Sequence, residues 1–168
     1  MPASDQNINP ARYQLIPRVL IFPMRDEAVC LIKLLPKNGK VTNWTGKYNG
    51  PGGHVERRED LSSAAQRELL EETGLHGQVS LVGTLMVDAP GPAGIGLFIF
   101  RADHLFGELL SSPEGIPEWL PFDRLDEYPL VEDVALILAR IRQMQPGEPP
   151  FAGRSYYDDK EKLQVVFC

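Results

Sequence analysis

In the stretch Gly53-His-Val-Glu-Arg-Arg-Glu59-Asp-Leu-Ser-Ser-Ala-Ala-Gln-Arg67-Glu68-Leu-Leu-Glu71-Glu72-Thr-Gly74-Leu75, a glycine-led turn is followed by residues that favour a helix. From Leu61 onward there is no proline, there is no β-branched residue before Thr73, and Leu, Ala, Glu and Arg are abundant. Gly74 then supplies a C-terminal stop. We therefore predict a helix that begins at Leu61 and ends before Gly74.

The acidic residues of this helix are unusually placed. Glu68, Glu71 and Glu72 are spaced i, i+3, i+4, which stacks three carboxylates on one face. A solvated charged face is one interpretation, but the row also contains small and apolar residues: Leu61, Ala64, Ala65 and Leu75. The alternative is that the acids point toward other protein, where carboxylates need a cation and hard divalent ions take oxygen ligands. Leu69 and Leu70 predict a second buried side.

The stretch resembles the Nudix box, G-x5-E-x7-R-E-U-x-E-E-x-G-U, where U is an aliphatic residue. Every specified position is occupied as the pattern requires: Gly53, Glu59, Arg67, Glu68, Leu69, Glu71, Glu72, Gly74 and Leu75. The resemblance implies an α/β (α+β) fold, a Nudix-type α/β/α sandwich with a central mixed β-sheet. It also implies Mg²⁺ or Mn²⁺ held by the box glutamates, and hydrolysis of a nucleoside diphosphate linked to a further group. The metal would neutralise the diphosphate oxygens and activate water.

Length and charge limit the domain organisation and the partners. The 168 residues fit one domain, which we place at residues 13–168 behind a flexible N-terminal tail, residues 1–12. The formal net charge of −6 and the sequence pI near 5.1 argue against binding a nucleic acid polymer. The negative net charge does not exclude a small anionic nucleotide, because the metal carries local positive charge.

The remaining composition points to a soluble protein. Cys30 and Cys168 do not resemble a disulfide framework, so a reducing compartment is expected. The N-terminal residues lack a signal-peptide core, and the apolar runs are too short to span a bilayer. We expect a cytoplasmic protein without a membrane partner, and the sequence leaves monomer and homodimer open.

Hydrophobic patterning predicts the other elements. The expected strands cover residues 14–24, 28–35, 78–89, 95–101 and 117–121, the expected second helix covers 131–144, and a hairpin joins 153–157 to 162–167. The strand 78–89 alternates so that one face carries Val79, Leu81, Leu85 and Val87. The second helix has the stripe Val134, Ile137, Leu138 and Ile141.

Outside the box, the sequence is most similar to the Nudix branch that cleaves oxidised purine nucleoside triphosphates. In that branch an Asn before the glycines contacts the purine, as Asn49 would here. A further metal-binding Glu stands five residues before a strand Trp, as Glu114 does before Trp119. Two adjacent acids that open the last helix read the base edge, and Glu132-Asp133 occupy that place. The C-terminal pattern of the branch is echoed by Phe151-Ala-Gly-Arg-Ser-Tyr-Tyr157.

Some of these positions have a simpler interpretation or depart from the branch. Leu130 stands where the branch has an aromatic wall for the base, and Glu132 is one methylene longer than the usual Asp. Acids at the start of a helix are also explained by the helix dipole. Glu114 lies in a turn by composition, and Lys33 either reaches the nucleotide or is a surface lysine at a strand end.

The expected enzyme is a Mg²⁺-dependent pyrophosphohydrolase that converts a nucleoside triphosphate, with 8-oxo-dGTP as the favoured type, to a monophosphate and pyrophosphate. The resemblance assigns the metal to Glu68, Glu71, Glu72 and Glu114 together with the Gly52 carbonyl, and the proton of water to a box glutamate. Arg67 would orient the acids, and Glu59 completes the catalytic set.

Two alternatives stay open. Pro90 lies 15 residues after Leu75, a spacing that marks the ADP-ribose branch, so ADP-ribose or a dinucleoside polyphosphate is the rival substrate. A non-catalytic nucleotide-binding module is the other, although such modules usually lose a box glutamate and this chain has all of them.

Overall fold

The computed structural model of the chain describes residue 9 and residues 11–168, so most of the predicted N-terminal tail lies outside the described residues. The elements follow in the order β1 (Gln14–Arg25), β2 (Ala28–Leu34), β3 (Tyr48–Asn49), β4 (Gly52–His54), α1 (Leu61–Thr73), β5 (Leu75–Val87), β6 (Ala93–Gly107), β7 (Gly115–Pro121), the 3-10 helix η2 (Phe122–Glu127), α2 (Val134–Gln143), β8 (Phe151–Tyr157) and β9 (Leu163–Phe167).

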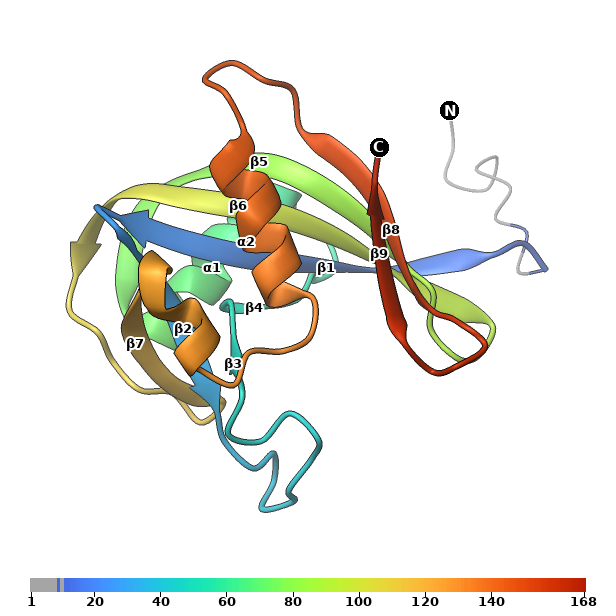
Figure 1. Ribbon diagram of the computed structural model, residues 1–168, viewed down its shortest axis with the longest axis horizontal. Coiled ribbons are helices and arrows are strands. Elements are labelled where there is room, and N and C mark those ends of the chain that lie inside the picture. Colours follow the sequence, from blue (N-terminus) through green and yellow to red (C-terminus); the bar gives the residue numbers. More distant parts are fainter. Residues whose placement is uncertain (1–8, 10) are drawn as a thin grey trace.

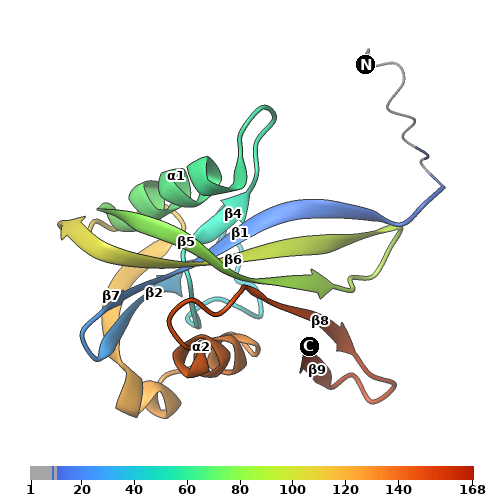
Figure 2. The ribbon, with the colours of Figure 1, turned by 90° about the horizontal axis from the view of Figure 1, so that it is seen from above.

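The strands form one mixed sheet between two helices. Its strand order is β3-β2-β1-β6-β5-β8-β9, with β4 paired to β1 and β7 paired to β2. The β1–β6 and β5–β8 pairs are parallel and the other pairs are antiparallel (Figure 1). Figure 2 shows α1 on one face of the sheet and α2 on the other. The predicted α/β/α sandwich is confirmed.

Helix α1 has the predicted bounds because both ends are capped. The Asp60 side chain accepts hydrogen bonds from the Ser62 and Ser63 N–H groups, and Gly74 adopts the left-handed conformation (φ 75°) that ends a helix. Leu69 is buried, but Leu70 is 42% exposed, so the prediction of a second buried side was wrong. Leu70 points about 100° away from Leu69 on the helix, beyond the single sheet face that α1 covers.

The sheet separates two hydrophobic clusters. Helix α1 contributes Ala64, Ala65 and Leu69 to the cluster on its face, which also contains Ile21 and Phe100. The cluster on the opposite face gathers the predicted stripe of α2 against the sheet: Val134, Ile137, Leu138 and Ile141. Helix α2 begins at Val134 rather than at residue 131, since residues 131–133 form an extended segment and a turn.

Strand β5 does not keep one hydrophobic face along its length. Val79 packs in the α1 cluster, whereas Leu85 and Val87 belong to the α2 cluster. A register shift between Leu81 and Gly83 puts an extra residue in β5, which turns every later side chain to the other face. The predicted shared face was therefore wrong, although the strand itself is present.

The other predicted strands are present with adjusted bounds. Strand β6 runs well beyond the predicted 95–101 and lies between β1 and β5, and the C-terminal hairpin is formed by β8 and β9. Both cysteines are free, Cys30 in the core and Cys168 exposed. Across residue 9 and residues 11–168, no helix is long and apolar enough to cross a membrane.

Candidate active site

The residues of the predicted metal site come together where β4 meets α1. The Gly52 N–H donates a hydrogen bond to Glu72 Oε2 at 2.9 Å, which ties the strand to the last turn of the helix. A Cβ on Gly53 would collide with the Glu68 carboxylate. Glycine at position 53 therefore lets the helix carboxylate approach the strand backbone closely.

Arg67 organises the acids around it. Its guanidinium holds Glu59 through two hydrogen bonds of 2.9 and 3.0 Å, and it donates to Glu68 at 2.7 Å and to Glu71 at 3.2 Å. It also donates to the His54 carbonyl at 3.1 Å, which fixes the loop between β4 and α1. The planar fork of arginine suits this multiple pairing. These contacts are those expected of an orienting residue.

The three helix acids do not share one environment. Glu68 and Glu72 are 8% and 7% exposed, whereas the side chain of Glu71 is 58% exposed. The prediction that all three turn inward holds for two of them. Positions 68 and 72 differ by about 40° around the helix, but position 71 lies about 100° from position 72, at the open edge.

Burial changes the proton affinity of the inward acids. The pKa of Glu72 is raised to about 8, chiefly by burial and also by the charges of Glu68 and Glu114, against the opposing hydrogen bond from the Gly52 N–H. Burial also raises the pKa of Glu68, while Arg67 lowers it. Glu59 has its pKa lowered, chiefly by its hydrogen bonds to Arg67. Among the described residues, Glu72 is thus a buried acid that forms no ion pair with a cation.

The donors at this place fit a hard divalent cation. Glu68, Glu72, Glu114 and the Gly52 carbonyl all offer oxygen ligands, and burial disfavours the ionised form of Glu72 unless a cation compensates it. In the described part of the chain, no three His, Cys, Asp or Glu side chains already form a group that could hold a metal. Two of these acids are instead in ion pairs: Arg67 holds Glu68, and Lys37 Nζ lies 3.6 Å from Glu114 Oε1.

A dependence of stability on pH follows for the metal-free protein. Folded Glu72 keeps its proton up to a pKa of about 8, whereas its ordinary value is 4.5, so folding binds a proton between those values. The free energy of unfolding should therefore fall as pH rises through this window, by roughly 2–4 kcal/mol. Urea denaturation in EDTA at about pH 5 and about pH 9 measures it, and Glu72→Gln should flatten the profile. A wild-type profile as flat as that of the variant would contradict the burial of this acid.

The predicted base-reading residues lie on neighbouring segments. The Tyr48 N–H donates to the Pro129 carbonyl at 2.8 Å and the Val131 N–H to the Tyr48 carbonyl at 2.9 Å, which places Asn49 beside the segment leading to Glu132 and Asp133. Asn49 Oδ1 accepts a hydrogen bond from the Gly50 N–H. The structure thus brings Asn49 and the acid pair to adjacent segments, although they are far apart in sequence.

Glu132 and Asp133 differ in their surroundings. The Tyr157 hydroxyl of β8 donates to Glu132 Oε2 at 3.0 Å. Asp133 occupies the N-cap of α2, but its side chain makes no capping hydrogen bond. Burial raises the pKa of Asp133, and the charge of Glu132 adds to the effect. Helix capping by its side chain therefore does not explain why an acid occupies position 133.

Lys33 lies apart from the other residues that were predicted to bind the substrate. Lys33 pairs with Tyr48 and Ile32 with Asn49, so Lys33 and Asn49 point to opposite faces of the β2–β3 pair. Lys33 Nζ lies 5.9 Å from the centroid of the Tyr48 ring. Lys33 and Asn49 therefore do not converge on one point.

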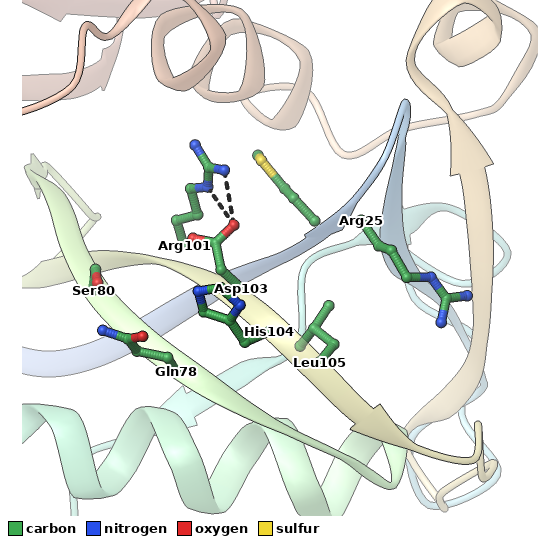
Figure 3. Close-up of a pocket in the computed structure, with 8 residues that line it drawn as sticks. Arg25, Gln78, Ser80, Arg101, Asp103, His104 and Leu105 are labelled. Atoms are coloured by element: carbon green, nitrogen blue, oxygen red, sulfur yellow. Dashed lines mark hydrogen bonds and ion pairs between the residues drawn. The ribbon is translucent and has the colours of Figure 1, made fainter.

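A hollow of about 600 Å³ lies elsewhere on the sheet (Figure 3). It is bordered by residues of β1, β5 and β6: Met24, Arg25, Gln78, Ser80, Arg101, Asp103, His104 and Leu105. Arg101 bonds Asp103 at 2.9 and 2.8 Å, so its charge is already compensated. None of the predicted site residues lines this hollow.

Two contacts near the site were not anticipated. Lys37 pairs with Glu114, and Tyr157 holds Glu132. The sequence did contain an indication of the Lys37–Glu114 contact. Residues 28–55 contain lysines but no Asp or Glu, so positive charge is concentrated there in an otherwise acidic chain. The second depends on how β8 packs beside α2, which no local pattern encodes.

Several known proteins are similar to this chain. Residues 14–141 match the family model described as NUDIX domain. The chain is 39% identical over 82 residues to the oxidized purine nucleoside triphosphate hydrolase of Danio rerio, covering 48% of this chain and 53% of that protein. It is 33% identical over 125 residues to the NAD-capped RNA hydrolase NudC of Edwardsiella ictaluri, covering 73% of this chain and 45% of that protein.

A solved structure supports the fold as well. The MutT protein of Bacillus halodurans superposes with a TM-score of 0.73 at 24% identity, covering 91% of this chain and 97% of the other. At this identity the likeness shows the fold alone. The chain spans about half the length of the curated relatives it matches.

Proposed function

Because this chain belongs to the Nudix family, we propose that it is a divalent-metal-dependent pyrophosphohydrolase of nucleoside triphosphates, with Mg²⁺ as the metal and an oxidised purine nucleotide as substrate. Nudix enzymes generally use divalent metal ions. The products would be a nucleoside monophosphate and pyrophosphate. The observation that carries the proposal is the pair of buried glutamates, Glu68 and Glu72, set against Gly52 and close to Glu114.

The chain's residues would share the chemistry as follows. Glu68, Glu72, Glu114 and the Gly52 carbonyl would hold the metal, which when bound would neutralise phosphate oxygens and lower the pKa of water. Arg67 keeps Glu68 and Glu71 oriented through its direct hydrogen bonds. A box glutamate takes the proton from the attacking water. Positioning and charge compensation, rather than a covalent intermediate with the enzyme, would supply most of the rate acceleration.

The choice of an oxidised purine rests on the second group of residues. Asn49 and the Glu132-Asp133 pair lie on adjacent segments, and burial raises the pKa of Asp133. Two adjacent acids that share a proton present both a donor and an acceptor, which suits a purine edge. The Danio rerio relative, whose name states this activity, supports the same assignment.

Replacing Asp133 with Ala should therefore affect purine substrates selectively. We expect kcat/KM for 8-oxo-dGTP to fall by about 10- to 100-fold, because a buried hydrogen bond to the base is lost, while a pyrimidine triphosphate should change little. Steady-state kinetics on both substrates measure the effect. Asp126→Ala, at an exposed position of η2, is the matched control. An equal loss on both substrates would mean that Asp133 does not read the base.

A second candidate substrate class is a nucleotide with a group beyond the diphosphate. Similarity to NudC covers more of this chain than the triphosphatase match does, and Pro90 has the spacing of the ADP-ribose branch. Product analysis on a panel of nucleotides, with Mg²⁺ and with EDTA, separates the two classes. Pyrophosphate released from triphosphates supports the proposal, and ADP-ribose or NAD cleaved far better than every triphosphate would overturn it.

A further inference from the structure

Positive charge is concentrated on one loop beside the candidate active site. Residues 28–55 contain no Asp or Glu, although the whole chain has a formal net charge of −6. The same run contains Lys33, Lys37, Lys40 and Lys47. Three of these lysines lie on residues 35–47, the connection between β2 and β3, which we name the lysine loop. It projects beyond both strands in Figure 1.

The lysine loop has a defined backbone. At its base, the Leu34 N–H donates to the Lys47 carbonyl at 2.9 Å and the Gly46 N–H donates to the Leu34 carbonyl at 2.8 Å. Within the loop, the Thr42 N–H donates to Thr45 Oγ1 at 2.9 Å. These bonds close the loop on itself, so its lysines extend from a fixed frame.

The start of the loop is joined to the acidic site. The Leu35 N–H donates to the Glu114 carbonyl at 2.9 Å, and Lys37 Nζ lies 3.6 Å from Glu114 Oε1. Glu114 is itself one of the predicted metal ligands. Lys37 is therefore the lysine of the loop that stands next to the predicted metal ligands.

The ion pair between Lys37 and Glu114 is weak enough for Lys37 to change partners. Both side chains are largely exposed, 73% and 53%, and exposed ion pairs contribute little net free energy. Lys37 can thus leave the carboxylate for a phosphate oxygen with little penalty. A polyphosphate that enters a site lined by Glu68, Glu71 and Glu72 adds negative charge there, which a nearby lysine offsets.

We propose that the lysine loop is a phosphate-binding arm of the active site, in which Lys37 binds the outer phosphates of the substrate, the part released as pyrophosphate. The inference rests on the proposed function, since it assigns the loop to the same polyphosphate. Lysine acts here as a mobile point charge on a long stem, which suits phosphate groups that leave after the reaction.

Calorimetry with inorganic pyrophosphate and Mg²⁺, using the full chain, tests the proposal. Lys37→Met should weaken pyrophosphate binding by about tenfold, and Lys37→Arg, which keeps the charge, should remain close to the wild type. Lys160→Met, on the turn between β8 and β9, is the matched control and should bind normally. Binding by Lys37→Met within about twofold of the wild type would overturn the proposal, as would a wild-type protein that does not bind pyrophosphate.

A titration with Mn²⁺ alone separates phosphate binding from an effect on the metal site. Lys37→Met should bind Mn²⁺ as well as or better than the wild type, because Glu114 loses a competing cation. Weaker Mn²⁺ binding that matches the loss of pyrophosphate binding would show that Lys37 acts through the metal ligands, and would overturn the proposal.

The pyrophosphate-binding test does not depend on whether the protein hydrolyses triphosphates. Lys37-dependent pyrophosphate binding by a protein that hydrolyses no triphosphate would refute the proposed function and keep the phosphate-binding arm. Hydrolysis of triphosphates with unchanged pyrophosphate binding in Lys37→Met would support the proposed function and refute the phosphate-binding arm.

Discussion

Glu72→Gln is expected to lower kcat by about a thousandfold or more on whichever nucleotide the wild-type protein cleaves. Gln keeps the size of the side chain and can still accept the hydrogen bond from the Gly52 N–H. It cannot supply a negative oxygen to a divalent ion, so the loss is one of chemistry rather than of packing. Steady-state kinetics with saturating Mg²⁺ measure the change.

The same variant should fold at least as well as the wild type. Glu72 is buried with its pKa raised to about 8, so at and above that pH the metal-free protein carries an uncompensated buried charge that Gln removes. Glu108→Gln, at an exposed position, is the matched control and should change neither activity nor stability. Full activity in Glu72→Gln would refute the assignment of the box glutamates to catalysis.

The helix of the Nudix box could be predicted from the sequence because the features that determine it lie close together in the chain. Helix propensity, the Gly74 stop and the spacing of Glu68 and Glu72 act within a few residues, and the structure has the helix with the predicted bounds. The sandwich followed from the resemblance that the box carries. The bulge of β5 was missed, since one extra residue shifts the register without altering composition, and Val79 and Leu85 then face opposite clusters.

Non-local placement explains the other differences at the site. The helix pattern grouped Glu71 with Glu68 and Glu72, but the sheet covers only part of the helix surface and leaves Glu71 at the open edge. Glu114 could be assigned only through the resemblance, and its partner Lys37 lies 77 residues earlier in the chain. Such contacts depend on β2 pairing with β7, which no short pattern encodes.

Arg67→Met is expected to affect both stability and activity. The guanidinium contacts Glu59, Glu68 and Glu71 as well as the His54 carbonyl, so its removal leaves acids of the site without their shared cation. Breaking a partly buried ion pair in this way should lower the free energy of unfolding by about 3 kcal/mol. Urea denaturation near neutral pH measures that loss, and Arg57→Met, an exposed neighbour in the same loop, is the control.

The activity of Arg67 variants distinguishes orientation from charge alone. Arg67→Lys keeps the positive charge but has no planar fork, so it cannot hold Glu59 through two bonds while also reaching Glu68 and Glu71. If Arg67 orients the acids, Arg67→Lys should lose kcat by roughly tenfold or more, with KM changing less, because a misplaced carboxylate weakens the transition state more than substrate binding. If charge alone matters, Arg67→Lys should be nearly as active as the wild type, and the orienting role would be refuted.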